Sequence, residues 1–477
     1  MPAARKPWHG PRRERVKVSK VTLIAVAAVL TVGCAVGPRY QKPLVSVPDT
    51  FRGASPEQTA AEQSLGDQQW SQVFRDDRLQ ELIRAALEKN YDVQIAAARI
   101  LQAEAQVGIT HADEYPTVEG GVTASNQRTP ALRFSTFNIS EVGLTGTASW
   151  ELDFWKKFRS ATEAARASLL ASQWARQAVI RTLVSDVAAA YFALRELDLE
   201  LEISRRTLAS RQESLGLIRL LADRGLASLL DVRQAEQLVY TASQAIPDLE
   251  RRIEQQENQI SLLTGSLPAA VPRGMALTEQ PLAAEVPSGL PSALLERRPD
   301  IREAEQRLIA LNAQIGAIRA RAFPQITLTA VGGFQSASLA DLFSGPAGLW
   351  TFVGDLTQPI FQKGKLRAGV RLAEAEQQEA VLAYEQAVRQ AFREVADALV
   401  AIRKSQEFRH QQELLAAAAE DAARLSGVRY RGGVTSYLEV LTNETNLFAA
   451  QRGLAQAHLG ERLALVQLYK ALGGGWQ

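Results

Sequence analysis

The residue types that most often do chemistry are sparse in this chain of 477 residues, and their spacing does not suggest catalysis. None of the four histidines has a histidine or cysteine partner at the spacing of a metal site. Acids follow His111, but a helix cap before Tyr115 explains them better. The segment Gly432–Ser436 lacks the lysine of a phosphate-binding loop. We therefore expect no enzymatic activity, no metal and no cofactor.

Cys34 is the single cysteine, so an internal disulfide is impossible. It follows a basic leader and an apolar stretch, Val21–Val32, which is too short to span a membrane in the mature protein. The tetrapeptide Thr31–Cys34 is similar to a bacterial lipobox, in which the cysteine becomes the acylated N-terminus. We expect a signal peptide over residues 1–33 and a lipid anchor, palmitate included, on Cys34; a chance free thiol is the alternative.

The leader accounts for the basic balance of the chain. It holds seven Lys and Arg residues and one acid, so the formal net charge falls from +2 to −4 without it. The basic balance therefore serves targeting, and we expect no nucleic-acid partner. Residues 34–76, which follow the leader, are rich in proline and polar residues, and this predicts an extended segment.

Residues 77–265 and 285–473 are two copies of one unit, related by a constant offset of 208 positions. The matching segments include Tyr115–Pro116 with Phe323–Pro324, Arg224–Val232 with Gly432–Val440, and Thr264–Gly265 with Leu472–Gly473. A duplication of this length means that the architecture is built twice. A proline-containing linker, residues 266–284, joins the copies, and residues 474–477 form a tail.

Each copy has helical and strand-like segments in the same order. Strands rich in Val, Thr, Gly and Ser are predicted at about residues 117–127, 142–152, 325–335 and 348–356. Shorter helices are predicted at about residues 79–88, 92–111 and 299–323. Helices of about 65 residues, or about 100 Å, are predicted over residues 159–224 and 366–431. Each turns at a glycine-containing tip into a return helix, over about 229–263 with a kink at Pro247, or about 437–472.

The long helices carry apolar residues at alternating spacings of four and three. These are Ile180, Val184, Val187, Tyr191 and Leu194, and at matching positions Val388, Phe392, Val395, Leu399 and Ile402. Such a seam predicts coiled-coil contacts with neighbouring helices. The alternative is an ordinary amphipathic core helix, but a helix of this length would extend beyond a globular core.

The strand pairs point to a membrane. Strands of about ten residues cross an outer membrane when tilted. Four strands cannot close a barrel, and an open sheet in lipid leaves backbone groups unpaired. The chain must therefore share a barrel with other copies, eight strands for two copies or twelve for three. Strand counting alone does not choose between the two.

Several segments together resemble a known family. They are Cys34–Pro43, Trp150–Trp155, Pro359–Phe361, Tyr430–Val434, Tyr437–Leu438, Leu447–Phe448 and Tyr469–Trp476. They are similar to the outer membrane factors, the OprM/NodT-type outer membrane efflux lipoproteins related to TolC, over nearly all of the mature chain. The resemblance implies a mostly α, α+β fold: a homotrimer with a 12-stranded β-barrel continuous with a periplasmic α-helical barrel.

The resemblance also implies a function and partners. The protein would be the outer-membrane exit channel of a tripartite efflux pump, with a periplasmic adaptor (a membrane fusion protein) and a proton-driven inner-membrane transporter. It would be lipid-anchored in the outer membrane, with a large periplasmic part. Type I protein secretion and metal-ion efflux use similar ducts, so the cargo stays open. A non-channel coiled-coil scaffold explains the helices but not the repeated strand pairs.

Two kinds of site follow from the resemblance. The hairpin tips would dock onto the adaptor, although glycines that only permit the turns are the alternative. The tip residues are Arg224, Gly225, Leu226, Ala227, Ser228, Gly432, Gly433, Val434, Thr435 and Ser436. The family's gate is a Leu with an Asp four residues later, and here Leu438 is followed by Thr442.

The gate acid is therefore missing from its usual position. Leu438 and Thr442 share a helix face, whereas Glu439 points about 100° away. Glu439, which matches Asp231 of the first copy, and Glu444 are the nearby acids. We expect a Leu438 ring as the main constriction of the channel and a weaker or displaced acidic ring. The alternative is that Leu438 only packs between helices.

Overall fold

The computed structural model describes residues 36–53, 64–130, 136–280, 287 and 289–476. The predicted signal peptide and Cys34 lie outside these residues, as do 281–284 of the predicted linker. The chain forms two compact units. The first unit contains residues 108–164 and 311–375, with the strands, and the described residues 36–40. The second contains the rest, which is helical apart from its connecting segments.

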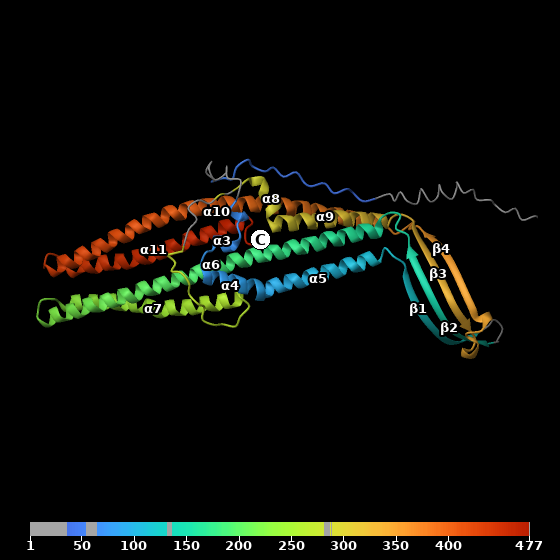
Figure 1. Cartoon of the computed structure of the whole chain (residues 1–477), viewed down its shortest axis with the longest axis horizontal. Coiled ribbons are helices and arrows are strands. Elements are labelled where there is room, and N and C mark those ends of the chain that lie inside the picture. Colours follow the sequence, from blue (N-terminus) through green and yellow to red (C-terminus); the bar gives the residue numbers. More distant parts are fainter. Residues whose placement is uncertain (1–35, 54–63, 131–135, 281–286, 288, 477) are drawn as a thin grey trace, which may run out of the picture. The chain divides into compact units, whose positions relative to one another are not determined.

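In the first unit the described residues form a four-stranded antiparallel sheet in chain order (Figure 1). Its strands are β1 (Thr117–Pro130), β2 (Thr136–Glu151), β3 (Gln325–Ser336) and β4 (Gly348–Thr357). The predicted positions are confirmed, but β1 and β2 extend into the segment expected to be a loop, with Arg128 opposite Asn138. Polar residues pair in an antiparallel ladder as readily as apolar ones, so polarity alone is a poor loop signal here.

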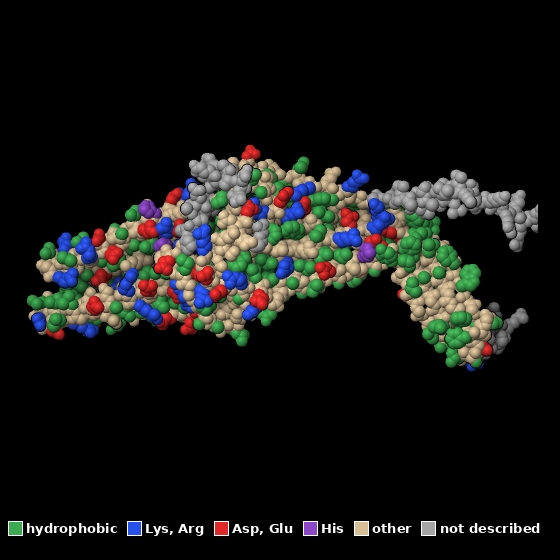
Figure 2. Space-filling view, viewed as in Figure 1, with side chains coloured by type: hydrophobic (Ala, Val, Ile, Leu, Met, Phe, Trp, Pro, Cys, Tyr) green, Lys and Arg blue, Asp and Glu red, His purple; other side chains and the backbone are tan. Residues whose placement is uncertain are grey.

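The two faces of the sheet differ sharply in polarity. Side chains alternate between faces along a strand, and directly paired residues share a face. By the observed register, one face carries Val118, Val122, Leu144, Ala148, Trp150, Leu328, Ala330, Phe334, Trp350, Phe352 and Leu356. The opposite face carries Glu119, Thr123, Thr145, Thr147, Ser149, Thr327, Thr329, Thr351 and Asp355, together with the apolar Val331, Leu349 and Val353. Figure 2 shows hydrophobic side chains gathered on the strands.

The edges of the sheet are open. Among the described residues, neither β1 nor β4 pairs with a strand on its outer side. Trp350 on β4 is 83% exposed and Val118 on β1 is 78% exposed. An apolar face bounded by two unpaired edges is stable only where other chains and a nonaqueous phase cover it.

The helices repeat in the same order in both copies. The first copy has α4 (Asp77–Lys89), α5 (Tyr91–Ala112), α6 (Lys157–Asp223) and α7 (Leu229–Leu263). The second has α8 (Leu294–Arg297), α9 (Pro299–Ala320), α10 (Lys365–Arg431) and α11 (Tyr437–Ala471). α6 and α10 have 67 residues each, and α7 and α11 have 35 each. The predicted helices are confirmed, and α7 continues through Pro247.

One part of the predicted extended segment is helical instead. Residues Leu65–Asp67 form a 3-10 turn, η1, and Trp70–Val73 form a short helix, α3. Ser64 and Asp67 form a capping box at this point, since each side chain accepts a hydrogen bond from the backbone N–H of the other residue. The Ser-x-x-Asp spacing is the signal that the sequence prediction passed over.

The seam of the long helices is buried within one chain. Val184, Val187 and Tyr191 on α6 are fully buried, as are Val388 and Val395 on α10. The seam is thus buried at these five positions, whereas Ile180 and Phe392 are half-buried. The coiled-coil contacts with neighbouring helices stay a prediction. α6 also contains a stretch long and apolar enough to cross a membrane, but 56% of that stretch is buried inside the protein, as in a core helix.

Matching residues make equivalent hydrogen bonds within each of the two copies. Asn90 Nδ2 donates to the carbonyl of Leu263 at the end of α7, at 2.9 Å. At the matching position Arg298 Nη1 donates to the carbonyl of Ala471 at the end of α11, at 3.1 Å. Each residue thus joins the start of a short helix to the end of a return helix.

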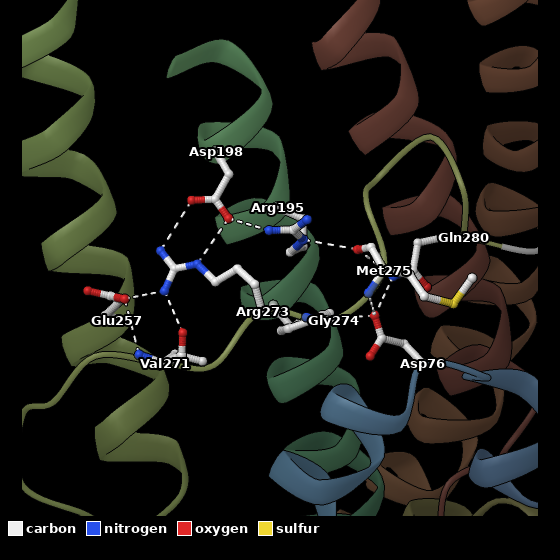
Figure 3. A network of polar contacts seen from close by, with 10 residues as sticks. Asp76, Arg195, Asp198, Glu257, Val271, Arg273, Gly274, Met275 and Gln280 are labelled. Atoms are coloured by element: carbon white, nitrogen blue, oxygen red, sulfur yellow. Dashed lines mark hydrogen bonds and ion pairs between the residues drawn. The ribbon is translucent and has the colours of Figure 1, made fainter. Parts of the chain in front are cut away.

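The segment that follows α7 is held by a polar network (Figure 3). The guanidinium of Arg273 pairs with Asp198 on α6 at 3.1 Å and with Glu257 on α7. Asp76 accepts hydrogen bonds from Gln280 Nε2 at 2.6 Å and from Met275 N at 2.9 Å. These hydrogen bonds hold the pKa of Asp76 below its usual value, against the opposing effect of burial. The chain between the copies is therefore fixed to both helices of the first hairpin.

Candidate gate and docking tips

The first tip is a tight turn with a closed cap. α6 ends at Asp223, and Gly225 follows with φ +72°, a conformation that favours glycine. Leu226 N donates back to the carbonyl of Leu221 at 2.8 Å, which ends the helix as a Schellman turn does. Ser228 and Asp231 then form a capping box at the start of α7. The Asp231 carboxylate is therefore used in capping α7.

The second tip has the same backbone and a different cap. Gly433 has φ +71°, and Val434 N donates to the carbonyl of Arg429 at 3.0 Å. Ser436 precedes α11 without a side-chain cap. The acid that matches Asp231 is Glu439, which accepts from the hydroxyl of Thr435 and lies 3.7 Å from Arg429 Nε. The two tips thus share a fold but use their acids differently.

Both tips present apolar side chains to solvent. Leu226 is 72% exposed and Val434, its match, is 70% exposed. An added Cβ at Gly225 or Gly433 would meet no neighbouring atom, so only the backbone conformation requires glycine there. Exposed apolar tips that are rigid in backbone are suited to contact another protein.

Two of the three predicted gate residues, Leu438 and Thr442, lie on one face of α11. Leu438 is 56% exposed, and the hydroxyl of Thr442 donates to the carbonyl of Leu438 at 2.9 Å. Glu439 lies off this face, half-buried against Thr435 and Arg429. The structure therefore places Leu438 and Thr442 together and sets Glu439 apart from them, in the geometry that the spacing predicts.

A hydrophobic cluster above the tips joins the two hairpins. It contains Leu215 and Ile218 of α6, Val232 and Val239 of α7, and Tyr437 and Val440 of α11. The rings of Tyr430 and Tyr437 lie 5.3 Å apart between centroids. Residues directly next to the gate positions therefore form the core that keeps the first hairpin against the second.

Sequence reasoning missed Arg211, which lies in this region. It is 2% exposed on α6, and it donates to the carbonyls of Leu238 on α7, at 2.8 Å, and Glu444 on α11, at 3.3 Å. Its Nε is 4.0 Å from the Glu444 carboxylate. Burial raises the pKa of Glu444, while Arg211 opposes the shift. Glu444 thus faces a buried arginine of α6.

A second buried polar group was also missed. Glu200 on α6 is fully buried, and its carboxylate meets Arg452 at 3.1 Å and Gln456 at 3.0 Å, both on α11. Glu196, one turn earlier, is 4% exposed. Burial, and the nearby charge of Glu200, raise the pKa of Glu196 to about 7. Charged residues in a long helix are normally predicted to face solvent, so the sequence carried no signal for either group.

Within the described residues, no group of three or more His, Cys, Asp or Glu side chains has the arrangement of a metal site. The tips and the gate face are thus the described features that match the predicted functional residues. Their exposed apolar side chains suit contact with another protein and constriction of a channel.

Comparisons with known proteins agree with this architecture. The model of the outer membrane efflux protein family matches residues 82–266 and 290–474. The chain is 38% identical over 464 residues to the probable efflux pump outer membrane protein TtgC of Pseudomonas putida, with 95% of each chain covered. It is 35% identical over 459 residues to the cation efflux system protein CusC of Escherichia coli, with 96% of this chain and 99% of that one covered.

Solved structures show the same fold. A crystal structure of CusC has a TM-score of 0.85 at 33% identity, covering 93% of this chain and 100% of that chain. The open state of the MtrE outer membrane channel of Neisseria gonorrhoeae has a TM-score of 0.83 at 33% identity, covering 93% and 99%. The duplicated fold of long helices and strand pairs is thus that of outer membrane channels. The chain belongs to the outer membrane efflux protein family, and it is an outer-membrane exit channel for efflux.

Proposed function

We propose that the protein is the homotrimeric exit channel of a tripartite pump that expels small organic molecules. The observation that carries this proposal is the one-sided apolar sheet with two open edges. Three copies of four strands give a closed barrel of twelve strands, which removes every edge and leaves a lumen. The apolar face then meets lipid, and the threonine-rich face lines the lumen.

The helices support the same assembly. Phe192 and Glu200 on α6 are 4% and 0% exposed, whereas Val400 and Phe408, their matches on α10, are 39% and 54% exposed. α10 therefore presents an apolar flank that the rest of the chain leaves uncovered. A neighbouring copy that packs against α10 would bury it and continue the ring of helices.

The tips serve the partners in this proposal. The first tip, Arg224–Ser228, and the second tip, Gly432–Ser436, dock onto the hairpins of a periplasmic adaptor. A proton-driven inner-membrane transporter supplies the energy through that adaptor. Substituting Ala227 or Ser436 with a bulky residue is expected to abolish efflux and to leave the homotrimer in the membrane. Efflux that survives a set of such changes would move the docking site elsewhere.

The gate is formed by Leu438 and Thr442 in this proposal. Threefold symmetry brings three Leu438 side chains together, while Glu439 is held aside by Thr435 and Arg429 and supplies a displaced acidic ring. Support comes from the exposure of Leu438 next to buried Tyr437 and Val440, which leaves its side chain free to meet the side chains of other copies.

A lipid anchor on Cys34 completes the proposal, with residues 34–76 as the anchored segment, 77–265 and 285–473 as the repeats, and 266–284 as the linker. Mass spectrometry of the mature protein tests the anchor, because an unmodified thiol or another cleavage site would exclude it. Cys34→Ala is expected to weaken membrane attachment and leave trimers intact, since acyl chains only add to a barrel that spans the membrane.

Export of metal cations is the second candidate, because CusC, a cation efflux system protein, is 35% identical over 96% of this chain. The test has two parts. Purified protein is expected to be a trimer that inserts ion-conducting pores into planar bilayers; a pore-free monomer would exclude the channel. In a strain lacking its own channel, the protein is expected to restore resistance to toluene and antibiotics. Restored resistance to metal cations alone would favour the second candidate.

A further inference from the structure

The end of the sheet that joins the helices carries exposed apolar and aromatic side chains. Tyr115 precedes β1 and Trp150 lies near the end of β2, at 58% and 39% exposure. Leu356 lies near the end of β4, and Ile360 and Phe361 follow it, at 68%, 96% and 85% exposure. In outer-membrane barrels such side chains mark the level at which lipid tails give way to headgroups.

Basic residues follow immediately along the chain, within the same unit. Exposed ones are Arg321 after α9, and Lys363, Lys365, Arg367 and Arg371 at the start of α10. No ion-pair partner exists for these five side chains among the described residues. Other basic residues of this unit do have acidic partners: Lys157 meets Glu151 at 2.8 Å, Arg159 meets Asp153 at 3.1 Å and Arg319 meets Glu374 at 2.5 Å. Within the described part of the chain, these five cations therefore have no counterion.

Two of the unpaired arginines line a hollow. It has a volume of about 560 Å³, and its wall is formed by Ala322, Leu366, Arg367, Val370 and Arg371. Arg367 and Arg371 are four residues apart on α10, so they lie on one face of the helix. The hollow is thus lined by two arginines and by apolar side chains.

We propose that this hollow binds an anionic phospholipid of the leaflet on the helix side of the outer membrane. The two guanidinium groups hold the phosphodiester, for which their planar donors are well suited. Leu366, Val370 and Ala322 contact the first methylenes of the acyl chains. Charge complementarity at a lipid boundary favours this occupant: two arginines without an ion-pair partner among the described residues lie directly beyond an exposed aromatic level. It rests on the outer-membrane placement of the sheet and is independent of gate and cargo.

The test uses the full-length protein in a mild non-ionic detergent. Native mass spectrometry measures binding of phosphatidylglycerol and of phosphatidylethanolamine with the same acyl chains. In the wild type phosphatidylglycerol is expected to bind more tightly. The double variant Arg367→Gln, Arg371→Gln is expected to lose about 30-fold of that affinity, roughly fivefold for each arginine near a lipid headgroup.

A matched control lies on the same helix. Arg389 and Arg393 have the same spacing, but Arg389 lies 3.3 Å from Glu385 and Arg393 lies 3.9 Å from Asp397. Arg389→Gln, Arg393→Gln makes the same change in charge and is expected to bind phosphatidylglycerol like the wild type. Its residues follow Arg367 and Arg371 by 22 positions, or about 33 Å of helix.

Four results would overturn the proposal. The first is an equal loss of lipid binding in the control, and the second is equal binding of phosphatidylethanolamine by the wild type. The third is displacement of the lipid by inorganic phosphate at equal concentration, which would indicate a site for small anions. The fourth is dissociation of the Arg367→Gln, Arg371→Gln trimer in lipid-free detergent, which would assign the arginines to contacts between copies. Pore conductance of that variant is expected to be normal, so failure of the channel function is scored separately.

Discussion

The helices α6 and α10 have the same length and matching positions, yet they have different surroundings. Glu196 and Glu200 of α6 are buried, whereas their matches, Lys404 and Phe408 of α10, are exposed. α6 packs against α7 and α11: Ile203 contacts Phe448 and Ala455, and Glu200 binds Arg452. The duplication therefore fixed the backbone of the two helices, while their neighbours decide which side chains are buried. At the position of α10 that matches Glu200, Phe408 is 54% exposed.

The two tips also share a backbone and differ in the partners of their side chains. Gly225 and Gly433 make the same turn, but the matching acids have different partners. Asp231 closes a capping box with Ser228, and Glu439 binds Thr435 and approaches Arg429 instead. Symmetry of the backbone thus leaves room for unequal functions, as in the proposal that places the gate beside the second tip alone.

The largest expected effect tests where the two repeats are equivalent. Val187 on α6 and Val395 on α10 occupy matching seam positions, and both are fully buried. Val187→Asp and Val395→Asp each bury an unpaired carboxylate, at a cost of several kcal/mol. Both variants are expected to give almost no folded trimer on native gels of outer-membrane extracts. A conservative change to Ile at each site is the control. Normal yield of either Asp variant would contradict the packing of that seam.

The sequence predicted the equivalent features well and the unequal ones poorly. The duplication, the order of elements and the seams follow from spacing and from proline and glycine positions, which are local signals. The hairpin of β1 and β2 was predicted too short because its threonines and asparagines also suit a loop. Arg211, Glu196 and Glu200 were missed because burial of a charge depends on partners distant in sequence. The gate residues were placed by resemblance, and the structure adds only their common face.

The next largest expected effect is on stability, and it distinguishes Asn90 from Arg298, the matching residues that join a short helix to a return helix. Arg298 is 1% exposed and pairs with Asp300 at 2.5 Å and with Glu394 at 2.8 Å. Arg298→Ala leaves these acids with fewer partners and is expected to destabilise the protein by about 3–5 kcal/mol. Asn90→Ala removes a neutral helix cap and is expected to cost about 1–2 kcal/mol. Denaturant unfolding in detergent measures both, and equal losses would mean that the ion pairs add nothing to the second junction.

The gate comparison concerns Leu438 on α11 and Leu230, its match on α7. Both are exposed, at 56% and 65%. Leu438→Ala is expected to raise single-channel conductance clearly, about twofold or more if the leucine ring is the narrowest point. Leu230→Ala is the matched control and is expected to leave conductance unchanged. An unchanged Leu438→Ala channel would remove the gate from this position, and a larger effect of Leu230→Ala would transfer it to the first tip.

Glu439 sharpens the same comparison through ion selectivity. Its carboxylate is half-buried beside Thr435 and Arg429, so it is expected to influence cations only through a displaced ring. Glu439→Gln is expected to reduce the cation preference of the open channel slightly. Reversal potentials in a salt gradient measure this preference. Asp231→Asn at the matching position is the control, and an equal shift there would show that the effect is one of net charge near the mouth.

The smallest effect is a pH dependence that only the first repeat should show. Burial raises the pKa of Glu196 to about 7, well above its ordinary value of 4.5, with Glu200 adding to the shift and Arg252 and Arg452 opposing it. Between these two pH values the folded chain keeps a proton that the unfolded chain has lost. The stability that this proton on Glu196 contributes is therefore fully present below about pH 4.5, and it is lost as the pH rises toward 7.

The stability lost over this window reflects the one proton that Glu196 gives up. Glu196→Gln cannot release a proton and is expected to flatten that part of the profile, measured as denaturation midpoints between pH 5 and 8. The matching Lys404 is exposed and pairs with Glu407 at 2.5 Å, so Lys404→Gln is expected to keep the wild-type slope. A wild-type slope in Glu196→Gln would place the titration elsewhere. A flat profile in both variants would mean that the overall charge of the protein, rather than the buried Glu196, sets the pH dependence.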